Sequence, residues 1–175
     1  MLPSVIGNGL ALFFAWLFAL AAMQKLRAPD YYRNLMSTYV SALPLGRFML
    51  LPIAGAELAL AILLLLPQTR VYGLAGSAGL LLAYAAMMAW QIWRGHSGMD
   101  CGCSGPGSEL AVSPALVVRN LVCACLALLS MSAPVGAVVG VVGLVLSVVI
   151  ALFMITFYLC SDQVIANAQQ MAGEI

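Results

Sequence analysis

The chain has 175 residues, of which 64% are hydrophobic and only 7% are charged. Its mean hydropathy of +1.07 excludes an ordinary soluble domain, whose surface needs far more charge. The formal net charge is +1 and no basic run occurs, so the composition also argues against a nucleic-acid partner. The sequence therefore predicts an integral membrane protein, with residues 1–175 forming a single domain in the lipid bilayer.

Five apolar stretches have the length of a membrane-spanning helix or come near it. A helix needs about 20 apolar residues to cross a hydrocarbon core about 30 Å thick. The stretches cover residues 5–23, 48–66, 71–93, 115–131 and 136–159. The fourth is the shortest and carries an arginine. The sequence thus predicts an all-α transmembrane bundle of four to five spans.

The first stretch has one feature of a secretory signal, because Ala19-Leu20-Ala21 would suit a cleavage site. A signal peptide, however, carries its positive charge before the apolar region. Here no Lys or Arg precedes the stretch, whereas Lys25 and Arg27 follow it. We therefore expect the first helix to be retained.

A shorter segment at about residues 31–40 has the pattern of an amphipathic helix, with Asp30 as its N-cap. Its apolar face is formed by Tyr32, Leu35, Met36, Tyr39, Val40 and Leu43. Because the segment is too short and too polar to span, we expect it to lie at the membrane surface. Two interpretations are open: it is a simple anchor, or it is a lid over the cysteine loop.

The cysteine loop, residues 94–113, is polar and contains Cys101-Gly102-Cys103. A disulfide needs Cα atoms about 4.4–6.8 Å apart, and a bend at Gly102, which tolerates positive φ, shortens the span between the two cysteines. Such a small ring is strained, and strained exposed disulfides are typical of catalytic or regulatory pairs. The competing interpretations are a metal clip and two unrelated thiols.

Five spans would place the loops after the first and third helices and the C-terminal tail on one membrane face. That face would carry residues 25–47, the cysteine loop and Cys160. The turns at residues 67–70 and 132–134 would lie on the opposite face.

Two ionisable residues fall within predicted spans, where a charge needs a partner. Glu57 is interpreted as a proton acceptor, an anchor for Arg119 or a hydrogen-bonded link between helices. Arg119 lies just after the cysteine loop and one helical turn before Cys123. Its guanidinium would favour a thiolate at Cys123 or in the cysteine loop.

The other cysteines have weaker claims to a role. Cys123 and Cys125 cannot pair within a helix, because residues two apart point to nearly opposite sides, and both suit packing. Cys160 is expected to end the fifth helix at the face of the cysteine loop. Cys123 and Cys160 therefore remain candidate resolving cysteines.

Several short signatures follow one another in order along almost the whole chain. They are Gln24-Lys25-Leu26-Arg27, Tyr39 with Leu43-Pro44, the mid-membrane Glu57, Asp100-Cys101-Gly102-Cys103 and Val118-Arg119-Asn120-Leu121. In this order and spacing they resemble the methylamine-utilisation MauE family, within the wider DoxX-like group. The resemblance makes Lys25, Glu57 and Asn120 expected supports of Cys101, Cys103 and Arg119. Ser104 departs from it, since an aromatic residue is expected there.

The resemblance implies a multi-pass protein of the bacterial inner membrane. It further implies a periplasmic thioredoxin-like partner, MauD, and a disulfide-rich exported client, the light subunit of methylamine dehydrogenase. The expected activity is thiol–disulfide exchange through a mixed disulfide. A quinone is a candidate electron acceptor, by analogy with other membrane disulfide catalysts.

Two arguments about orientation disagree. The cysteine face carries most of the basic residues, namely Lys25, Arg27, Arg33, Arg47 and Arg94, against Arg70 opposite. The positive-inside rule would place that face in the cytoplasm, whereas disulfide delivery to an exported protein requires the periplasm. We expect the periplasm, because several of these side chains would be paired or part of the site.

Two alternatives belong to other functional classes. A soft-metal protein would bind copper(I) or zinc through His96, Cys101 and Cys103, with help from Asp100 or Cys160. A non-catalytic assembly factor would use the same membrane scaffold, and its cysteines would be incidental.

Overall fold

The computed structural model describes residues 2–39, 49–95, 101–102, 105, 110–132 and 140–173. Within these residues it has six α-helices. They are α1 (Leu2–Arg27), α2 (Pro29–Tyr39), α3 (Leu50–Leu65), α4 (Arg70–Trp93), α5 (Pro114–Ser130) and α6 (Val141–Ala172). The predicted all-α class is confirmed.

Three of the helices, α1, α4 and α6, are long and apolar enough to cross a membrane. The helices α3 and α5 are also apolar, but they have only 16 and 17 residues. At 1.5 Å per residue they are about 24 and 26 Å long, slightly short of a typical hydrocarbon core. Three candidate spans are therefore shown, and the count of five stays a prediction.

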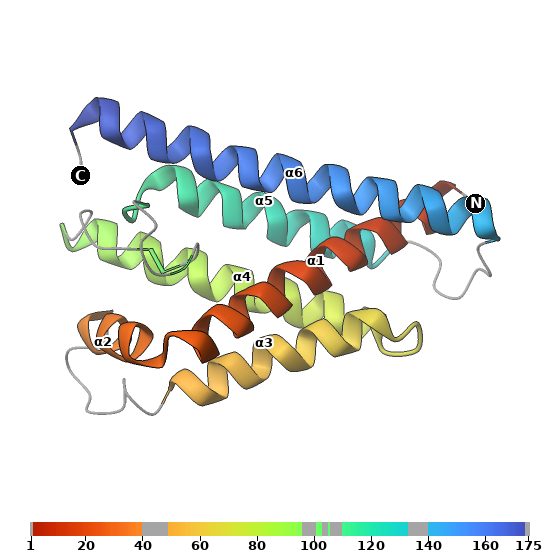
Figure 1. Ribbon diagram of the computed structural model, residues 1–175, viewed down its shortest axis with the longest axis horizontal. Coiled ribbons are helices and arrows are strands. Elements are labelled where there is room, and N and C mark those ends of the chain that lie inside the picture. Colours follow the sequence, from red (N-terminus) through yellow and green to blue (C-terminus); the bar gives the residue numbers. More distant parts are fainter. Residues whose placement is uncertain are drawn as a thin grey trace.

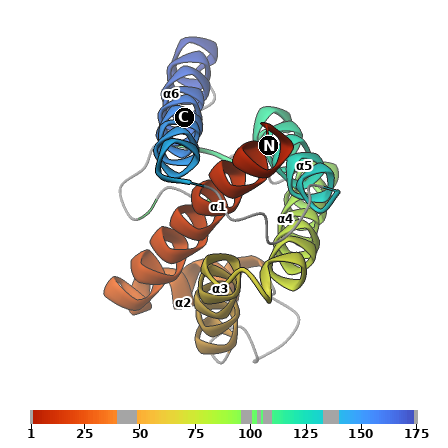
Figure 2. The same ribbon diagram turned by 90° about the vertical axis from the view of Figure 1, so that its right-hand side faces the viewer.

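Helix α1 holds the bundle together. It packs against α3 on one side and α6 on the other, while α4 packs against α5 and α3. Seen along the bundle, α1 crosses between α6 and the group formed by α3, α4 and α5 (Figure 2). Its buried side chains include Phe13, Phe14 and Phe18, which form the centre of the main apolar core.

Among the described residues, the predicted grouping of the helix ends is confirmed by the direction of the helices. The C-terminal ends of α1, α4 and α6 lie at the same end of the bundle as α2 and the start of α5, and the chain's N-terminus and the α3–α4 turn lie at the other end (Figure 1). Asn8 of α1 accepts a hydrogen bond from Arg70 at that second end. The residues around Cys101 therefore lie at the same end of the bundle as helix α2.

Helix α2 has the predicted amphipathic character, although it begins at Pro29 and not at Tyr31. Tyr32 is buried, whereas Asp30, Arg33 and Asn34 are exposed. Arg33 pairs with Asp30 one turn earlier at 3.3 Å, which is an exposed and therefore weak ion pair. Its apolar face points into the bundle, so α2 is a packed element of the fold.

Helix α6 does not end near Cys160, as the loss of hydropathy suggested, but continues to Ala172. It has 32 residues and is about 48 Å long. The residues after Cys160 are more polar, but they include good helix formers such as Ala and Gln. The helix stops at Gly173, whose φ of 70° is left-handed. The polar extension reaches the residues around Cys101.

A candidate thiol–disulfide site

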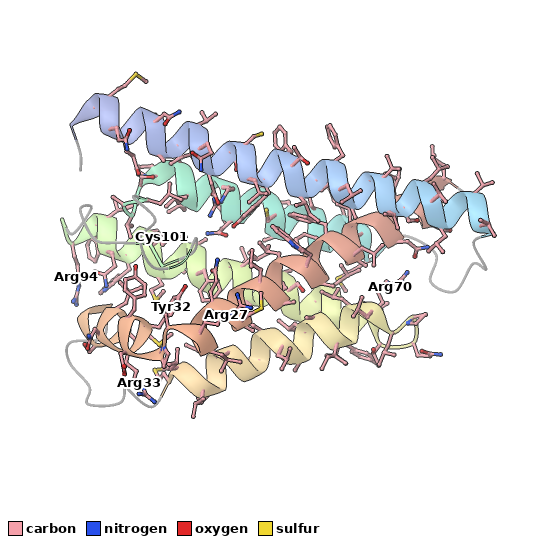
Figure 3. All side chains as sticks on the ribbon, viewed as in Figure 1. Arg27, Tyr32, Arg33, Arg70, Arg94 and Cys101 are labelled. Atoms are coloured by element: carbon pink, nitrogen blue, oxygen red, sulfur yellow. The ribbon has the colours of Figure 1, made fainter. Side chains whose placement is uncertain are left out.

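Cys101 is one of the residues of the cysteine loop that the structure describes, and its sulfur is in a disulfide bond. It is buried, with 8% of its surface exposed, and its backbone N–H donates to the Leu110 carbonyl oxygen at 2.9 Å. Its Sγ lies 3.7 Å from the Sδ of Met88 on α4. Figure 3 shows Cys101 and Tyr32 at the same end of the bundle. Cys103 lies outside the described residues.

Gly102 adopts the left-handed conformation that the sequence predicted, with a φ of +69°. A Cβ added there would collide with Cδ2 of Leu35 and lie 3.6 Å from Cε1 of Tyr32. Both contacts come from α2, so the loop backbone passes directly beneath that helix. Gly105 approaches Gln24 at the end of α1 in the same way. These contacts favour the interpretation of α2 as a cover over the cysteine loop.

A charged cluster lies buried below the loop. The Lys25 Nζ is 2.8 Å from Glu57 Oε1, and the Tyr84 hydroxyl donates to the same oxygen at 2.6 Å. Glu57 is completely buried. The Lys25 ammonium also lies 5.5 Å from the centre of the Tyr32 ring, close enough for a cation–π attraction. Lys25 is thus the partner of Glu57, and the interpretation of Glu57 as an anchor for Arg119 is wrong.

A cavity of about 160 Å³ separates Cys101 from this cluster. Its wall contains Cys101, Lys25, Glu57, Tyr84 and Asn120, and most of its other lining residues are apolar. The three supporting residues that were expected from the sequence, Lys25, Glu57 and Asn120, therefore meet Cys101 at a single cavity.

Three polar atoms at the cavity have no hydrogen-bond partner among the described residues. They are Tyr32 Oη, Glu57 Oε2 and Asn120 Nδ2. Burial, with smaller contributions from Tyr31 and Glu57, raises the pKa of Tyr32 to about 12, so its hydroxyl keeps its proton at neutral pH. A buried polar atom normally has a partner, and the three atoms together make this cavity a candidate binding site.

Arg119 forms an ion pair with Asp162 of α6. Its guanidinium carbon also lies 4.5 Å from the centre of the Tyr158 ring. The ion pair gives the buried guanidinium of α5 a counter-charge and links α5 to α6. Asp162 was not identified from the sequence. A usable signal was present, because in a chain with so few charges a lone acid just beyond the fifth apolar stretch is a natural partner for a buried arginine.

Gln169, also on the extension of α6, holds the end of the cysteine loop. Its Nε2 donates to the Ala111 carbonyl oxygen at 2.8 Å, and its Oε1 accepts from the Ala111 N–H at 3.2 Å. The side-chain amide therefore pairs with the backbone as a neighbouring strand would. No pattern in the sequence pointed to this residue.

The remaining described cysteines, Cys123, Cys125 and Cys160, are free thiols. Cys123 is buried in the main core and Cys125 is exposed, which confirms that the two point to different sides of α5. Cys160 is exposed in the middle of α6. A resolving role for Cys123 or Cys160 stays a prediction.

The residues expected to bind a metal fall largely outside the described part of the chain. His96, Asp100 and Cys103 all lie in its gaps. Among the residues that are described, no three His, Cys, Asp or Glu side chains form a metal-binding group. The soft-metal hypothesis is therefore untested.

Of the basic residues predicted to flank the cysteine face, Arg47 lies outside the described residues. Arg33 and Arg94 lie at the end of the bundle that contains Cys101, and Arg70 lies at the opposite end (Figure 3). Of the residues at the Cys101 end, Lys25 is neutralised by Glu57. The ion pair thus removes one of the positive charges on which the positive-inside argument depends.

Comparison with known proteins places the chain in a family. The family model for methylamine utilisation protein MauE matches residues 3–133. Methylamine utilization protein MauE of Paracoccus denitrificans is 36% identical over 121 residues, which cover 68% of this chain and 64% of that protein. The protein of the same name from Methylophilus methylotrophus is 35% identical over 97 residues, 53% of this chain and 50% of its own.

A third relative, methylamine utilization protein MauE of Paracoccus versutus, is 30% identical over 118 residues, covering 66% of this chain and 63% of that protein. The chain thus spans between half and just under two thirds of these relatives. No solved structure matches the chain. The family model covers the cysteine loop, Glu57 and Arg119, and the chain belongs to the MauE family of methylamine utilisation proteins.

Proposed function

We propose that the protein is a membrane thiol–disulfide oxidoreductase that assists disulfide formation in an exported protein. The observation that carries this proposal is the disulfide-bonded Cys101, which lies beneath a helical cover and in the wall of a cavity that also contains the Lys25–Glu57 ion pair. Membership of the MauE family suggests that the client belongs to methylamine utilisation. The disulfide-rich light subunit of methylamine dehydrogenase is the candidate client, and a thioredoxin-like protein similar to MauD is the candidate partner.

The reaction is thiol–disulfide exchange between the partner and the pair Cys101 and Cys103. A partner thiolate attacks one sulfur of the pair, forms a mixed disulfide and releases the other sulfur as a thiolate. The second partner thiol, after losing its proton, then attacks the mixed disulfide. The partner leaves with a disulfide, and Cys101 and Cys103 are left as two thiols that hold the two electrons and two protons.

Access to Cys101 requires movement of its cover. Only 8% of the residue is exposed, and Gly102 lies against Leu35 and Tyr32 of α2. A partner thiol must approach a sulfur directly, so we propose that α2 moves aside when the partner docks. In this role α2 is the lid of the site.

Arg119 does not line the cavity, and we propose that it stabilises a thiolate formed during the exchange, because a guanidinium favours the ionised thiol. Its pairing with Asp162 means that it would have to share its charge between the carboxylate and the thiolate. Cys160 or Cys123 would act as a resolving thiol only if the pair itself does not complete the exchange. We propose that the site faces the periplasm from the bacterial inner membrane.

The proposal is tested by trapping the mixed disulfide in cells that express the full chain. In Cys103→Ser, the thiol of Cys101 has no intramolecular partner, so a covalent complex with a thioredoxin-like protein should accumulate and should disappear on reduction. Cys101→Ser tests the opposite assignment of the attacked sulfur. Cys125→Ser is the matched control, since Cys125 is an exposed thiol away from the cavity.

The alternatives make different predictions for the same variants. Normal client maturation in both Cys101→Ser and Cys103→Ser would contradict the proposal and support a non-catalytic assembly factor. Stoichiometric copper or zinc in the purified protein, lost in either variant, would support the soft-metal hypothesis instead.

A further inference from the structure

The cavity beside Cys101 has the properties of a binding site for a small amphipathic molecule. We propose that it binds the head group of a lipid-soluble quinone, and that this quinone oxidises the thiols of Cys101 and Cys103 after each exchange. This inference rests on the proposed function, because it names the electron acceptor that the thiol–disulfide exchange requires.

The size of the cavity suits one aromatic ring. Its volume is about 160 Å³, and a cavity of about 150 Å³ in another protein holds a single benzene ring. A monocyclic benzoquinone ring would therefore fill most of the space.

The polar atoms of the wall match the two redox states of a quinone. Tyr32 Oη and Asn120 Nδ2 are donors without partners among the described residues, and a quinone has two carbonyl oxygens that accept hydrogen bonds. Glu57 Oε2 is an acceptor that likewise lacks a partner there, and the hydroxyl group of a hydroquinone donates. The site therefore offers hydrogen bonds to both the oxidised and the reduced ring.

The apolar part of the wall provides a route for the isoprenoid tail. The cavity is lined in part by Leu20 of α1, Met87 of α4 and Leu159 of α6. Met87 is 38% exposed and Leu159 47% exposed, and both belong to helices apolar enough to span a membrane. The cavity thus reaches the apolar outer surface of the bundle. Water alone would serve the three polar atoms but would not explain this apolar opening.

The quinone accepts all the electrons and protons that the two thiols release in the proposed step. Two S–H bonds, those of Cys101 and Cys103, are broken and one S–S bond is formed. The two electrons pass to the ring, and the two protons end on its two oxygens, which gives the hydroquinone. The Lys25 ammonium and the Glu57 carboxylate lie 2.8 Å apart at the cavity, so Lys25 can pass a proton to the ring and take one back from a thiol, which restores the ion pair.

Binding is measured apart from thiol chemistry in the full chain carrying Cys101→Ser and Cys103→Ser, purified in lipid nanodiscs, with ubiquinone-1 as the probe. In this background Ala21→Phe places a ring in the cavity wall, since Ala21 is a lining residue. Ala19→Phe is the matched control on the same helix, because Ala19 is exposed and does not belong to the lining. Asn120→Leu removes one donor at nearly constant volume.

We expect saturable binding that is about tenfold weaker in Asn120→Leu, as the loss of one buried hydrogen bond implies. Binding should be weakened at least as much in Ala21→Phe, because the new ring occupies the space of the quinone ring, and unchanged in Ala19→Phe. Thermal unfolding of each variant establishes that it is folded. Equal affinity in all four proteins, or no saturable binding, would overturn the inference.

Oxidation of the thiols by the quinone is tested in the protein that retains Cys101 and Cys103, after both have been reduced. One hydroquinone should appear for each disulfide formed. Binding without thiol oxidation would overturn the electron-transfer step. If the mixed disulfide with the partner still forms but ubiquinone-1 does not bind, the quinone inference fails and the proposed exchange function stands.

Discussion

Lys25 and Glu57 are separated by 32 residues in the chain, and their contact joins the C-terminal end of α1 to the middle of α3 in the interior. Taking a single charge out of water is costly, and pairing removes much of that cost. The Tyr84 hydroxyl, which donates to the same carboxylate at 2.6 Å, brings α4 into the contact. Three helices are thereby set in register beside the cavity.

The first prediction concerns this pair. Lys25→Met should lower the free energy of unfolding by about 3–5 kcal/mol, because it leaves Glu57 buried without its counter-charge. Adding Glu57→Gln should recover part of the loss, since the double variant has no unpaired charge. The measurement is unfolding in mixed micelles. Arg27→Met, at an exposed position near the end of α1, is the control, and a Lys25→Met protein no less stable than this control would contradict the account.

The second prediction concerns Gly102. Gly102→Ala should weaken the contact between the loop and α2, because a left-handed φ costs a residue with a Cβ about 1–2 kcal/mol and because the new methyl would collide with Leu35. A phosphine reductant should therefore reduce the disulfide faster than in the unmodified chain, as followed by mass spectrometry. Leu35→Ala in the same protein removes the collision but leaves the backbone cost.

Gly79→Ala is the control for this substitution, since a methyl group there meets open space. A reduction rate in Gly102→Ala that equals the rate in Gly79→Ala would show that α2 does not restrict access to Cys101.

At the residue scale, the sequence identified the buried charged residues correctly but did not identify their interaction partners. The cost of an ionisable group in a membrane identified Glu57 and Arg119, and the structure gives both of them partners. The partners themselves depend on the way helices pack, which hydropathy does not encode. The sequence suggested that Glu57 would pair with Arg119. In the structure Glu57 pairs with Lys25, and Arg119 pairs with Asp162.

At the scale of the elements, α6 has two roles. Its first part is apolar and largely exposed on the bundle surface, as expected for a helix in contact with lipid. Its second part carries Asp162 and Gln169, which hold Arg119 and Ala111. The extension of α6 therefore fixes both the start of α5 and the end of the cysteine loop.

The third prediction tests this second role. Gln169→Ala removes two hydrogen bonds from the buried backbone of Ala111, which should cost about 1–3 kcal/mol and let that segment open. The Ala111 amide should lose protection from hydrogen exchange, as measured by mass spectrometry on the intact protein. Gln163→Ala, at an exposed position of the same helix, should change nothing. Retained protection in Gln169→Ala would show that the segment is held by other contacts.

The sequence predicted the elements well where apolar length or amphipathic pattern defines them. Each of the five apolar stretches corresponds to a helix, and the amphipathic segment is α2. The end of α6 was misplaced because hydropathy falls at Cys160 while the helix, which depends on backbone hydrogen bonds and helix propensity, continues. A helix that passes from an apolar to a polar environment loses hydropathy at that point without ending there.

For the whole molecule, the direction of the helices places α2, Cys101 and the C-terminal end of α6 together (Figure 1). That arrangement followed from counting spans, because successive membrane helices alternate in direction. Arg33 and Arg94 at the Cys101 end (Figure 3) favour the cytoplasm by the positive-inside rule, whereas the proposed client requires the periplasm.

The most direct test of the central claim is labelling with a membrane-impermeant thiol reagent, in intact and in lysed cells, with and without prior reduction, followed by mass mapping of all five cysteines. A periplasmic, reducible pair predicts that Cys101 and Cys103 are labelled in intact cells only after reduction. Cys125 reports labelling that is unrelated to the loop. Labelling of Cys101 and Cys103 only after lysis, and without any need for reduction, would place free thiols in the cytoplasm and contradict the account.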